Sequence, residues 1–435
     1  MGSENEGLSR TGVNATRRWR IAPTLILCAS LLCAHSTLAQ FTQQGPKLVG
    51  AGAIGDALQG RSVSISADGN TAIVGGDGDS FSPFDDVNPD PGSLGAAWIW
   101  TRSSGVWVQG PKLVGSGAVR AAQGNAVSIS ADGNTAIVGG PFDNGDVGAA
   151  WIWTRSGGAW SQQGPKLVGS GALKVARQGW SVALSADGQT ALVGGSFDDA
   201  NTGAAWVWTK SGGVWSQQGP KLVGSGPTFN AGQGSAVALS ADGNTALIGG
   251  EGVWIWSRSG GVWTQQGSRL IESGGGYSVA LSADGSAALV GGGRGGTASF
   301  WTRNGSVWSQ GGTLVASNPV LPVSLSADGN TAVGGAPTYS NYAGAVWVWK
   351  RSEGVWTSGT QLIGADAVAG AGWNPQQGVS VALSGDGNTL IFGGNLDDSN
   401  GAAWVFSAYP VPAVSAWLLA TLAGVLAMIG IWRIR

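Results

Sequence analysis

Cysteine and histidine are nearly missing from this sequence of 435 residues, which holds two Cys and one His. All three, Cys28, Cys33 and His35, lie near the N-terminus. If that part is removed on export, the remaining chain has no disulfide, no Cys/His zinc site, no Ser-His-Asp triad and no Cys-His pair, because each needs one of these side chains. Stability must then come from packing and from how the fold closes.

Charge is also scarce: 11% of the residues are charged and the net charge is −2. This balance gives no electrostatic reason to expect a nucleic-acid partner. Glycine and tryptophan are abundant instead, with 77 and 23 copies. Such a composition favours many short strands joined by tight turns over a helical protein.

The N-terminal 39 residues have the pattern of a secretion signal. Arg17, Arg18 and Arg20 precede an apolar run over 21–32, and Thr37-Leu38-Ala39 forms a small-residue cleavage site. A lipoprotein signal is disfavoured because a leucine stands before each cysteine. Twin-arginine export is disfavoured because Arg20 occupies a position where that signal usually has an apolar residue. We therefore expect residues 1–39 to be removed after Ala39 and the rest to be exported.

An Asp-Gly turn recurs seven times in the remaining chain. Successive turn aspartates are 64, 55, 55, 42, 44 and 58 residues apart, at Asp68, Asp132, Asp187, Asp242, Asp284, Asp328 and Asp386. Each unit reads as four strand-like segments, which in the third unit are 181–185, 190–193, 204–209 and 214–223. Four antiparallel strands at a spacing of roughly 50 residues are typical of a propeller blade.

The ends of the chain indicate how the units close. Seven copies of the first three strands end at 402–406, whereas the fourth strand has six internal copies. Its seventh copy is at the start, where 41–49 matches 161–168 and 216–223. We therefore predict an all-β fold: a seven-bladed β-propeller of four-stranded antiparallel blades over residues 40–408. The N-terminal strand would complete the last blade and remove the exposed sheet edges.

Tryptophans recur within the units as pairs two residues apart, such as Trp98 and Trp100, with a further Trp107 on the next strand. Residues two apart share one face of a sheet, so packing between blades is favoured over carbohydrate stacking. Blades five and six are expected to be irregular, because unit five has a short loop over 291–297 and unit six begins with Pro319 and Pro322.

The repeat resembles the FG-GAP unit of integrin α-chain propellers and of many bacterial secreted proteins. The likeness lies in segments such as 178–188, 191–195 and 333–337 and extends over about residues 41–407. A double glycine followed by tryptophan is also similar to a kelch blade, so the propeller is the firmer inference. Integrin-type calcium turns carry several carboxylates, whereas the turns here offer one Asp and usually one Asn, as in Asp68 with Asn70. We expect ordinary hairpins at these turns.

The loops between the second and third strands are variable and acidic, and in a propeller they share a face with the links between blades. Variable loops on a repeated scaffold commonly bind partners. We expect this face to bind an extracellular protein or glycan through Asp85, Asp86, Asp143, Asp146, Asp198, Asp199, Asp397 and Asp398. Calcium at Asp198, Asp199, Asp397 and Asp398 is one hypothesis, and solvated turn residues are the alternative. No other cofactor is expected.

Two other classes of function compete with binding. Propellers also house lyases and hydrolases that use paired carboxylates. Here the acidic residues stand in near-identical copies, and only Glu251, Glu272 and Glu353 follow the signal segment as glutamates. Catalysis is therefore not expected. A passive structural component of an extracellular matrix is the third alternative.

The C-terminus carries a second targeting pattern. A Pro-containing linker over 409–415 precedes a run without charge over 416–432 and the end Arg433-Ile434-Arg435. This pattern predicts a transmembrane helix over 416–435 with its basic end in the cytoplasm. The segment resembles the IPTL-type C-terminal sorting domain through Pro412, Ser415 and Trp417. The resemblance implies a Gram-negative host, an exosortase-like sorting enzyme and at least transient anchoring in the inner membrane; a plain membrane anchor is the alternative.

Overall fold

A computed structural model describes residues 40–80, 92–173, 175–226, 230–271, 275–293, 297–316, 322–369 and 374–409. The chain divides into two units, of which Phe41–Tyr409 forms one and the two termini the other. The predicted signal with its cleavage site at Ala39, the sorting motif at Pro412, Ser415 and Trp417, and the predicted membrane helix all lie outside the described residues. Within the described ranges, no helix is long and apolar enough to span a bilayer.

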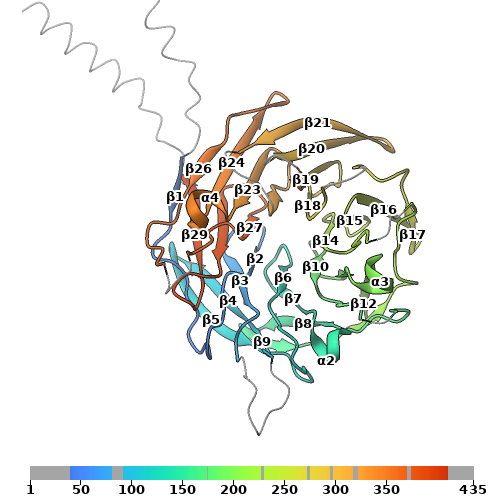
Figure 1. The fold of residues 1–435 in the computed structure, drawn as a ribbon, viewed down its shortest axis with the longest axis horizontal. Coiled ribbons are helices and arrows are strands. Elements are labelled where there is room, and N and C mark those ends of the chain that lie inside the picture. Colours follow the sequence, from blue (N-terminus) through green and yellow to red (C-terminus); the bar gives the residue numbers. More distant parts are fainter. Residues whose placement is uncertain are drawn as a thin grey trace, which may run out of the picture. The chain divides into compact units, whose positions relative to one another are not determined.

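The described residues of Phe41–Tyr409 form seven antiparallel sheets arranged around a central axis (Figure 1). Blade 1 comprises β2 (Ser62–Ile65), β3 (Thr71–Gly76), β4 (Ala96–Ser103) and β5 (Val106–Leu113). Blade 2 comprises β6 (Ala126–Ile129), β7 (Thr135–Gly140), β8 (Ala149–Ser156) and β9 (Ala159–Gln162). Blade 3 comprises β10 (Ser181–Leu184), β11 (Thr190–Gly195), β12 (Ala204–Ser211) and β13 (Val214–Gln217). Blade 4 comprises β14 (Ala236–Leu239), β15 (Thr245–Gly249), β16 (Val253–Ser259) and β17 (Val262–Gln265).

The remaining blades follow the same order with local changes. Blade 5 comprises β18 (Ser278–Leu281), β19 (Ala287–Gly293), β20 (Thr297–Asn304) and β21 (Val307–Val315). Blade 6 comprises β22 (Val323–Leu325), β23 (Thr331–Ala336), β24 (Ala345–Ser352), β25 (Val355–Trp356) and β26 (Thr360–Leu362). Blade 7 comprises β27 (Ser380–Leu383), β28 (Thr389–Gly394), β29 (Ala402–Tyr409) and β1 (Gln40–Gln43). Three short helical turns lie in loops: α2 (Asp143–Asp146), α3 (Asp198–Asn201) and α4 (Tyr339–Tyr342). The predicted seven-bladed propeller is confirmed.

Blades 5 and 6 are irregular, as the sequence predicted. The β19–β20 and β20–β21 pairings of blade 5 both contain a register shift, and the β4–β5 pairing of blade 1 contains one as well. In blade 6 the outer strand is divided, so that β25 and β26 both pair with β24. These changes stay inside single blades, and the innermost strands β18 and β22 keep their contacts with β14 and β27 of the neighbouring blades.

The N-terminal strand completes blade 7, which has the strand order β1-β29-β28-β27. Past β1, the Gln44 amide donates to Val405 O at 2.7 Å, and Leu48 exchanges two backbone hydrogen bonds with Ala403. Phe41 and Leu48 are buried in the adjoining cores. The predicted closure of the ring by the two ends of the domain is therefore confirmed.

A closed circle of backbone hydrogen bonds joins the seven blades at the turn after each innermost strand. One turn residue of each blade donates its amide to the carbonyl of the next blade, at 2.8 to 3.0 Å. The participants are Ala67, Ala131, Ala186, Ala241, Ala283, Ala327 and Gly385, and Gly385 donates back to Ala67. All seven bonds can form only when the ring is complete, so the circle couples every blade to the closure.

The Asp-Gly turns are hairpins whose carboxylates serve their own loops. In blade 1, Asp68 accepts hydrogen bonds from the Ser66 hydroxyl (2.5 Å), the Asn70 amide N–H (2.9 Å) and the Asn70 side chain (3.1 Å). Partial burial alone would raise the pKa of the Asp68 carboxyl, but these hydrogen bonds outweigh it and lower the pKa. The hairpin interpretation of these turns is confirmed.

The repeated tryptophans fill the spaces between blades. Trp98, Trp151, Trp206, Trp254 and Trp404 are fully buried. Trp206 donates its ring N–H to Ser170 O at 2.8 Å, under the loop that begins at Gly169. A Cβ atom on Gly169 would lie 2.1 Å from the Trp206 ring, so glycine is required there. The packing interpretation is confirmed, since no tryptophan is among the large exposed apolar side chains of the described residues.

Candidate functional site

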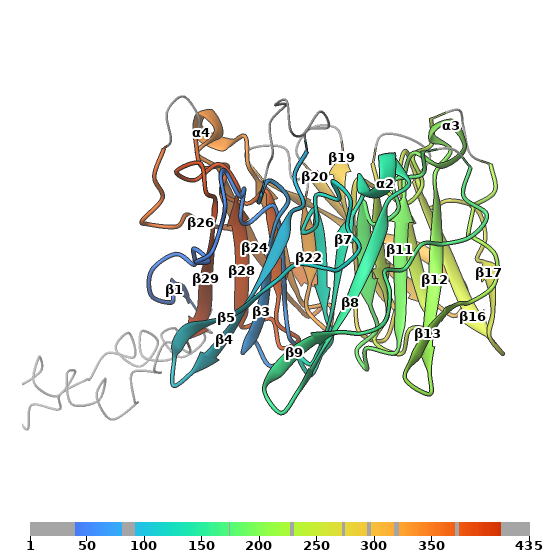
Figure 2. The same cartoon turned by 90° about the horizontal axis from the view of Figure 1, so that it is seen from below.

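The acidic loops and the links between blades share one face of the ring. Figure 2 shows α2, α3 and α4 at one end of the propeller, with the β8–β9 and β12–β13 hairpins at the other. In blade 3, the Leu173 amide of the preceding link donates to Asp198 Oδ1 at 2.6 Å, and the Asp199 amide donates to Leu173 O. The predicted common face is confirmed. We call it the loop face.

Three of the predicted binding aspartates are buried within their blades. Asp143, Asp198 and Asp397 are about 1% exposed, and each forms an ion pair with a lysine of the outer-strand segment: Lys166 (2.5 Å), Lys221 and Lys47. Their second carboxylate oxygen accepts a backbone amide of the link. Asp79 and Lys112 form a fourth such pair at 2.6 Å. The sequence signal for these pairs was a lysine repeated at one position of the unit.

The other predicted aspartates are more exposed or lie outside the described residues. Asp199 and Asp398 are exposed, and Asp146 lies 3.4 Å from the guanidinium of Arg177. Asp85 and Asp86 fall in the segment 81–91, outside the described residues.

The calcium hypothesis concerned the neighbouring pairs Asp198/Asp199 and Asp397/Asp398. In each pair one carboxylate is buried with a lysine and a backbone amide while its neighbour is exposed. Among the described residues, no group of three or more His, Cys, Asp or Glu side chains is placed to hold a metal ion. Calcium binding stays a prediction, and an ion at either pair would have to displace the lysine.

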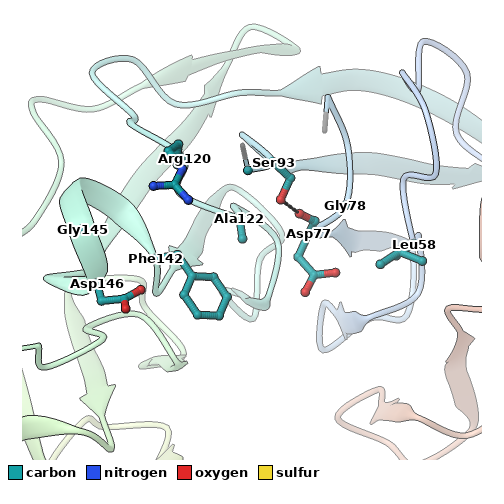
Figure 3. A pocket seen from close by; sticks show the side chains of 10 residues that line it. Leu58, Asp77, Gly78, Ser93, Arg120, Ala122, Phe142, Gly145 and Asp146 are labelled. Carbon is teal, nitrogen blue, oxygen red and sulfur yellow. Dashed lines mark hydrogen bonds between the residues drawn. The ribbon is translucent and has the colours of Figure 1, made fainter. Parts of the chain in front are cut away.

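The loop face is hollowed between blades 1 and 2 by a cavity of about 500 Å³. Its lining includes Asp77, Arg120, Ala122, Phe142 and Asp146. In the view of Figure 3, the Phe142 ring lies between the carboxylates of Asp146 and Asp77. A concave site with an apolar surface and a few polar groups is the usual form of a ligand pocket.

Asp77 is the chemically unusual residue of this cavity. Its Oδ1 atom is buried without a hydrogen-bond partner, and its Oδ2 atom lies 3.5 Å from Arg61 Nε. Burial raises the pKa of the Asp77 carboxyl, although the positive charge of Arg61 opposes the shift. A buried group with a perturbed pKa in a cleft is a functional-site candidate. Of the equivalent residues, Pro141, Ser196 and Asn395 are uncharged. Glu251 of blade 4 is acidic, but its carboxylate accepts a hydrogen bond from the Tyr277 hydroxyl.

The second cavity lies over the central channel, beside the circle of turn hydrogen bonds, and has about 230 Å³. All blades contribute near-identical apolar positions to it, such as Ile65, Ile129 and Leu184. Because the same residue types recur around this cavity, its lining has no distinctive polar group. The cavity between blades 1 and 2 is therefore the better candidate for a ligand-binding site.

Comparison of the sequence with models of known protein families finds no match, and comparison with curated proteins finds no relative.

Proposed function

We propose that this chain is an exported FG-GAP-type propeller that acts at the cell surface or envelope of a Gram-negative bacterium. It serves there as a binding, adhesion or display module through its loop face. The cavity between blades 1 and 2 carries this proposal, because it is a concave site on the variable face of an otherwise repetitive ring.

The repeated acidic residues support a binding role by what they already do. Asp79, Asp143, Asp198 and Asp397 are buried and each is paired with a lysine, and the turn aspartates hold hairpins. Polar groups engaged in this way are poorly placed for acid-base chemistry. Asp77, by contrast, has a buried carboxylate oxygen that no donor of the described residues satisfies. Binding at the cavity therefore fits the placement of the charges better than catalysis spread over the blades.

Export and anchoring are also part of the proposal and rest on the two terminal sequence patterns. Removal of residues 1–39 and processing by an exosortase-like enzyme would deliver the propeller outside the cytoplasm. Mass spectrometry of the mature protein tests both ends. A first residue at Gln40 and loss of Arg435 support the proposal, whereas an intact Arg435 overturns sorting and leaves plain anchoring.

Screening residues 40–409 against glycan and matrix-protein arrays, with and without calcium, tests the binding role. The cavity variant Asp77→Asn is compared with Val262→Ser, a change at an exposed position of the opposite hairpin end. A hit that Asp77→Asn weakens and Val262→Ser leaves unchanged supports the proposal. No hit, or a hit that is insensitive to Asp77, overturns it, and turnover of a bound glycan overturns the non-catalytic role.

A further inference from the structure

The junctions between blades provide an internal comparison for the cavity. Between blades 2 and 3, the guanidinium of Arg177 lies over the rings of Phe142 (5.0 Å) and Phe197 (4.1 Å). Trp180 lies 6.5 Å from Phe142 and 5.5 Å from Phe197, measured between ring centroids. We call these four side chains the Arg177 cluster. The Arg177 cluster occupies, between blades 2 and 3, the position on the loop face at which the cavity lies between blades 1 and 2.

Hydrogen bonds establish which residues are equivalent at the two junctions. Gln123 and Gln178 form the same parallel bridge, to Gly95 and Gly148. Counting from these glutamines, Ala122 is equivalent to Arg177 and Asn125 to Trp180.

The aromatic positions are matched in the same way. Gly78 is equivalent to Phe142, because their amides donate to Ala57 O and Ala121 O at 3.2 and 3.3 Å. At the junction between blades 1 and 2, Phe142 stands where Phe197 stands at the junction between blades 2 and 3, because each residue precedes the short helical turn of the second blade. Three of the four side chains of the cluster are therefore missing between blades 1 and 2, and the fourth, Phe142, lines the cavity.

We infer that the cavity binds a guanidinium group, supplied by an arginine side chain of a partner protein, in the place that Arg177 occupies at the next junction. The Phe142 ring offers an aromatic face to the cation. Asp77 Oδ1 offers a buried acceptor that has no donor. The lining carries the carboxylates of Asp77 and Asp146 and the cation of Arg120. Arg61 lies 3.5 Å from Asp77 Oδ2 and Arg177 lies 3.4 Å from Asp146 Oδ2, so Asp77 Oδ1 is the acceptor on which the inference depends. This inference rests on the proposed binding function and names its ligand chemistry.

Blocked amino acids are suitable probes. N-acetyl-arginine amide is titrated into residues 40–409 by calorimetry, and the citrulline analogue, which is neutral and nearly isosteric, is the matched control. We expect the citrulline probe to bind at least about tenfold more weakly, because it lacks the cation. Equal affinity for the two probes, or no binding of the arginine probe at millimolar concentration, overturns the inference.

The substitution Ala122→Arg tests the location. Ala122 and Arg177 have the same backbone conformation, with φ of 51° and 53°, so an arginine at 122 has a precedent one blade later. We expect the variant to keep the wild-type melting temperature and to lose binding of the arginine probe. Asp77→Asn, which preserves the shape of the side chain, should weaken probe binding about tenfold. Unchanged probe affinity in both variants refutes this location.

The outcomes separate this inference from the proposed function. A partner that Ala122→Arg displaces while the arginine probe does not bind leaves the binding function intact and removes the guanidinium. If Ala122→Arg displaces a neutral glycan, the binding function also stands and the guanidinium ligand is ruled out. Binding of the arginine probe without any array hit keeps the guanidinium site and overturns the partner-binding function as proposed.

Discussion

Deleting residues 40–50 should abolish the stable propeller, because this segment holds the two ends of the ring together. It buries Phe41 and Leu48, whose burial contributes about 1.5–3 kcal/mol each. Its removal also leaves the Asp397 carboxylate, which is 1% exposed and paired with Lys47, without its cation, at a cost of about 3–5 kcal/mol. Together these losses are comparable to the ~5–15 kcal/mol by which a whole domain is stable.

The deletion also acts beyond the local contacts. The link residue Asp366 accepts hydrogen bonds from the Lys47 amide (2.7 Å), the Gln43 side chain (3.1 Å) and the Trp404 ring N–H (2.8 Å), so two of its three partners are lost. The deletion exposes the edge of β29 as well, which invites pairing between molecules. Urea unfolding followed by tryptophan fluorescence, together with size-exclusion chromatography, should show a loss of the cooperative transition and the appearance of aggregates.

A circular permutant is the matched control. A Gly-Gly turn joining Tyr409 to Gln40 reproduces the equivalent turn of blade 3, in which Ser211 and Val214 flank two glycines. The new termini are placed between Gly212 and Gly213, where a side chain would meet nothing within 4 Å. We expect the permutant to unfold at nearly the wild-type urea concentration. A truncated protein with an unchanged midpoint refutes the role of this segment in closing the ring.

Three further predictions concern single side chains. Lys221→Met leaves the buried Asp198 carboxylate unpaired and should cost about 3–5 kcal/mol in urea unfolding, whereas a change of under ~1 kcal/mol would show that the pair does not hold the outer strand. Asp77→Asn should raise the melting temperature at pH 7. Burial raises the pKa of Asp77 in the folded state, so ionisation of the wild-type carboxyl destabilises the fold as the pH rises above about 4. The gain in melting temperature should therefore vanish below that pH. A gain that persists at pH 3 would contradict this origin. Asp242→Asn should lower the melting temperature at pH 7, because partial burial of Asp242 is outweighed by hydrogen bonds from Ser240 and Asn244, which lower its pKa in the folded state. This loss should disappear once acid has protonated the wild-type carboxyl. Equal losses at pH 7 and pH 2 would show that the ionised carboxylate is not the cause.

The sequence alone determined the number of blades, the strands within them and the closure of the ring. These features follow from local rules: alternation of apolar residues marks strands, and Asp-Gly and Gly-Gly mark their turns. Closure could be read from a count, because the N-terminal copy of the outer-strand segment is the one that the last unit lacks. The tryptophan pairs were likewise assigned to packing correctly, since residues two apart on a strand share a face.

Only the tertiary structure decided what each acidic residue does. Asp143 and Asp146 are three residues apart and look alike in the sequence, yet Asp143 is buried with Lys166 while Asp146 lies on the surface near Arg177. Ala122 and Gly78 line the cavity beside Asp77, and Arg177 and Phe142 stand at their positions one junction later. Repeat positions can be aligned from the sequence, but whether a missing side chain leaves a space or the neighbours close over it depends on packing in three dimensions.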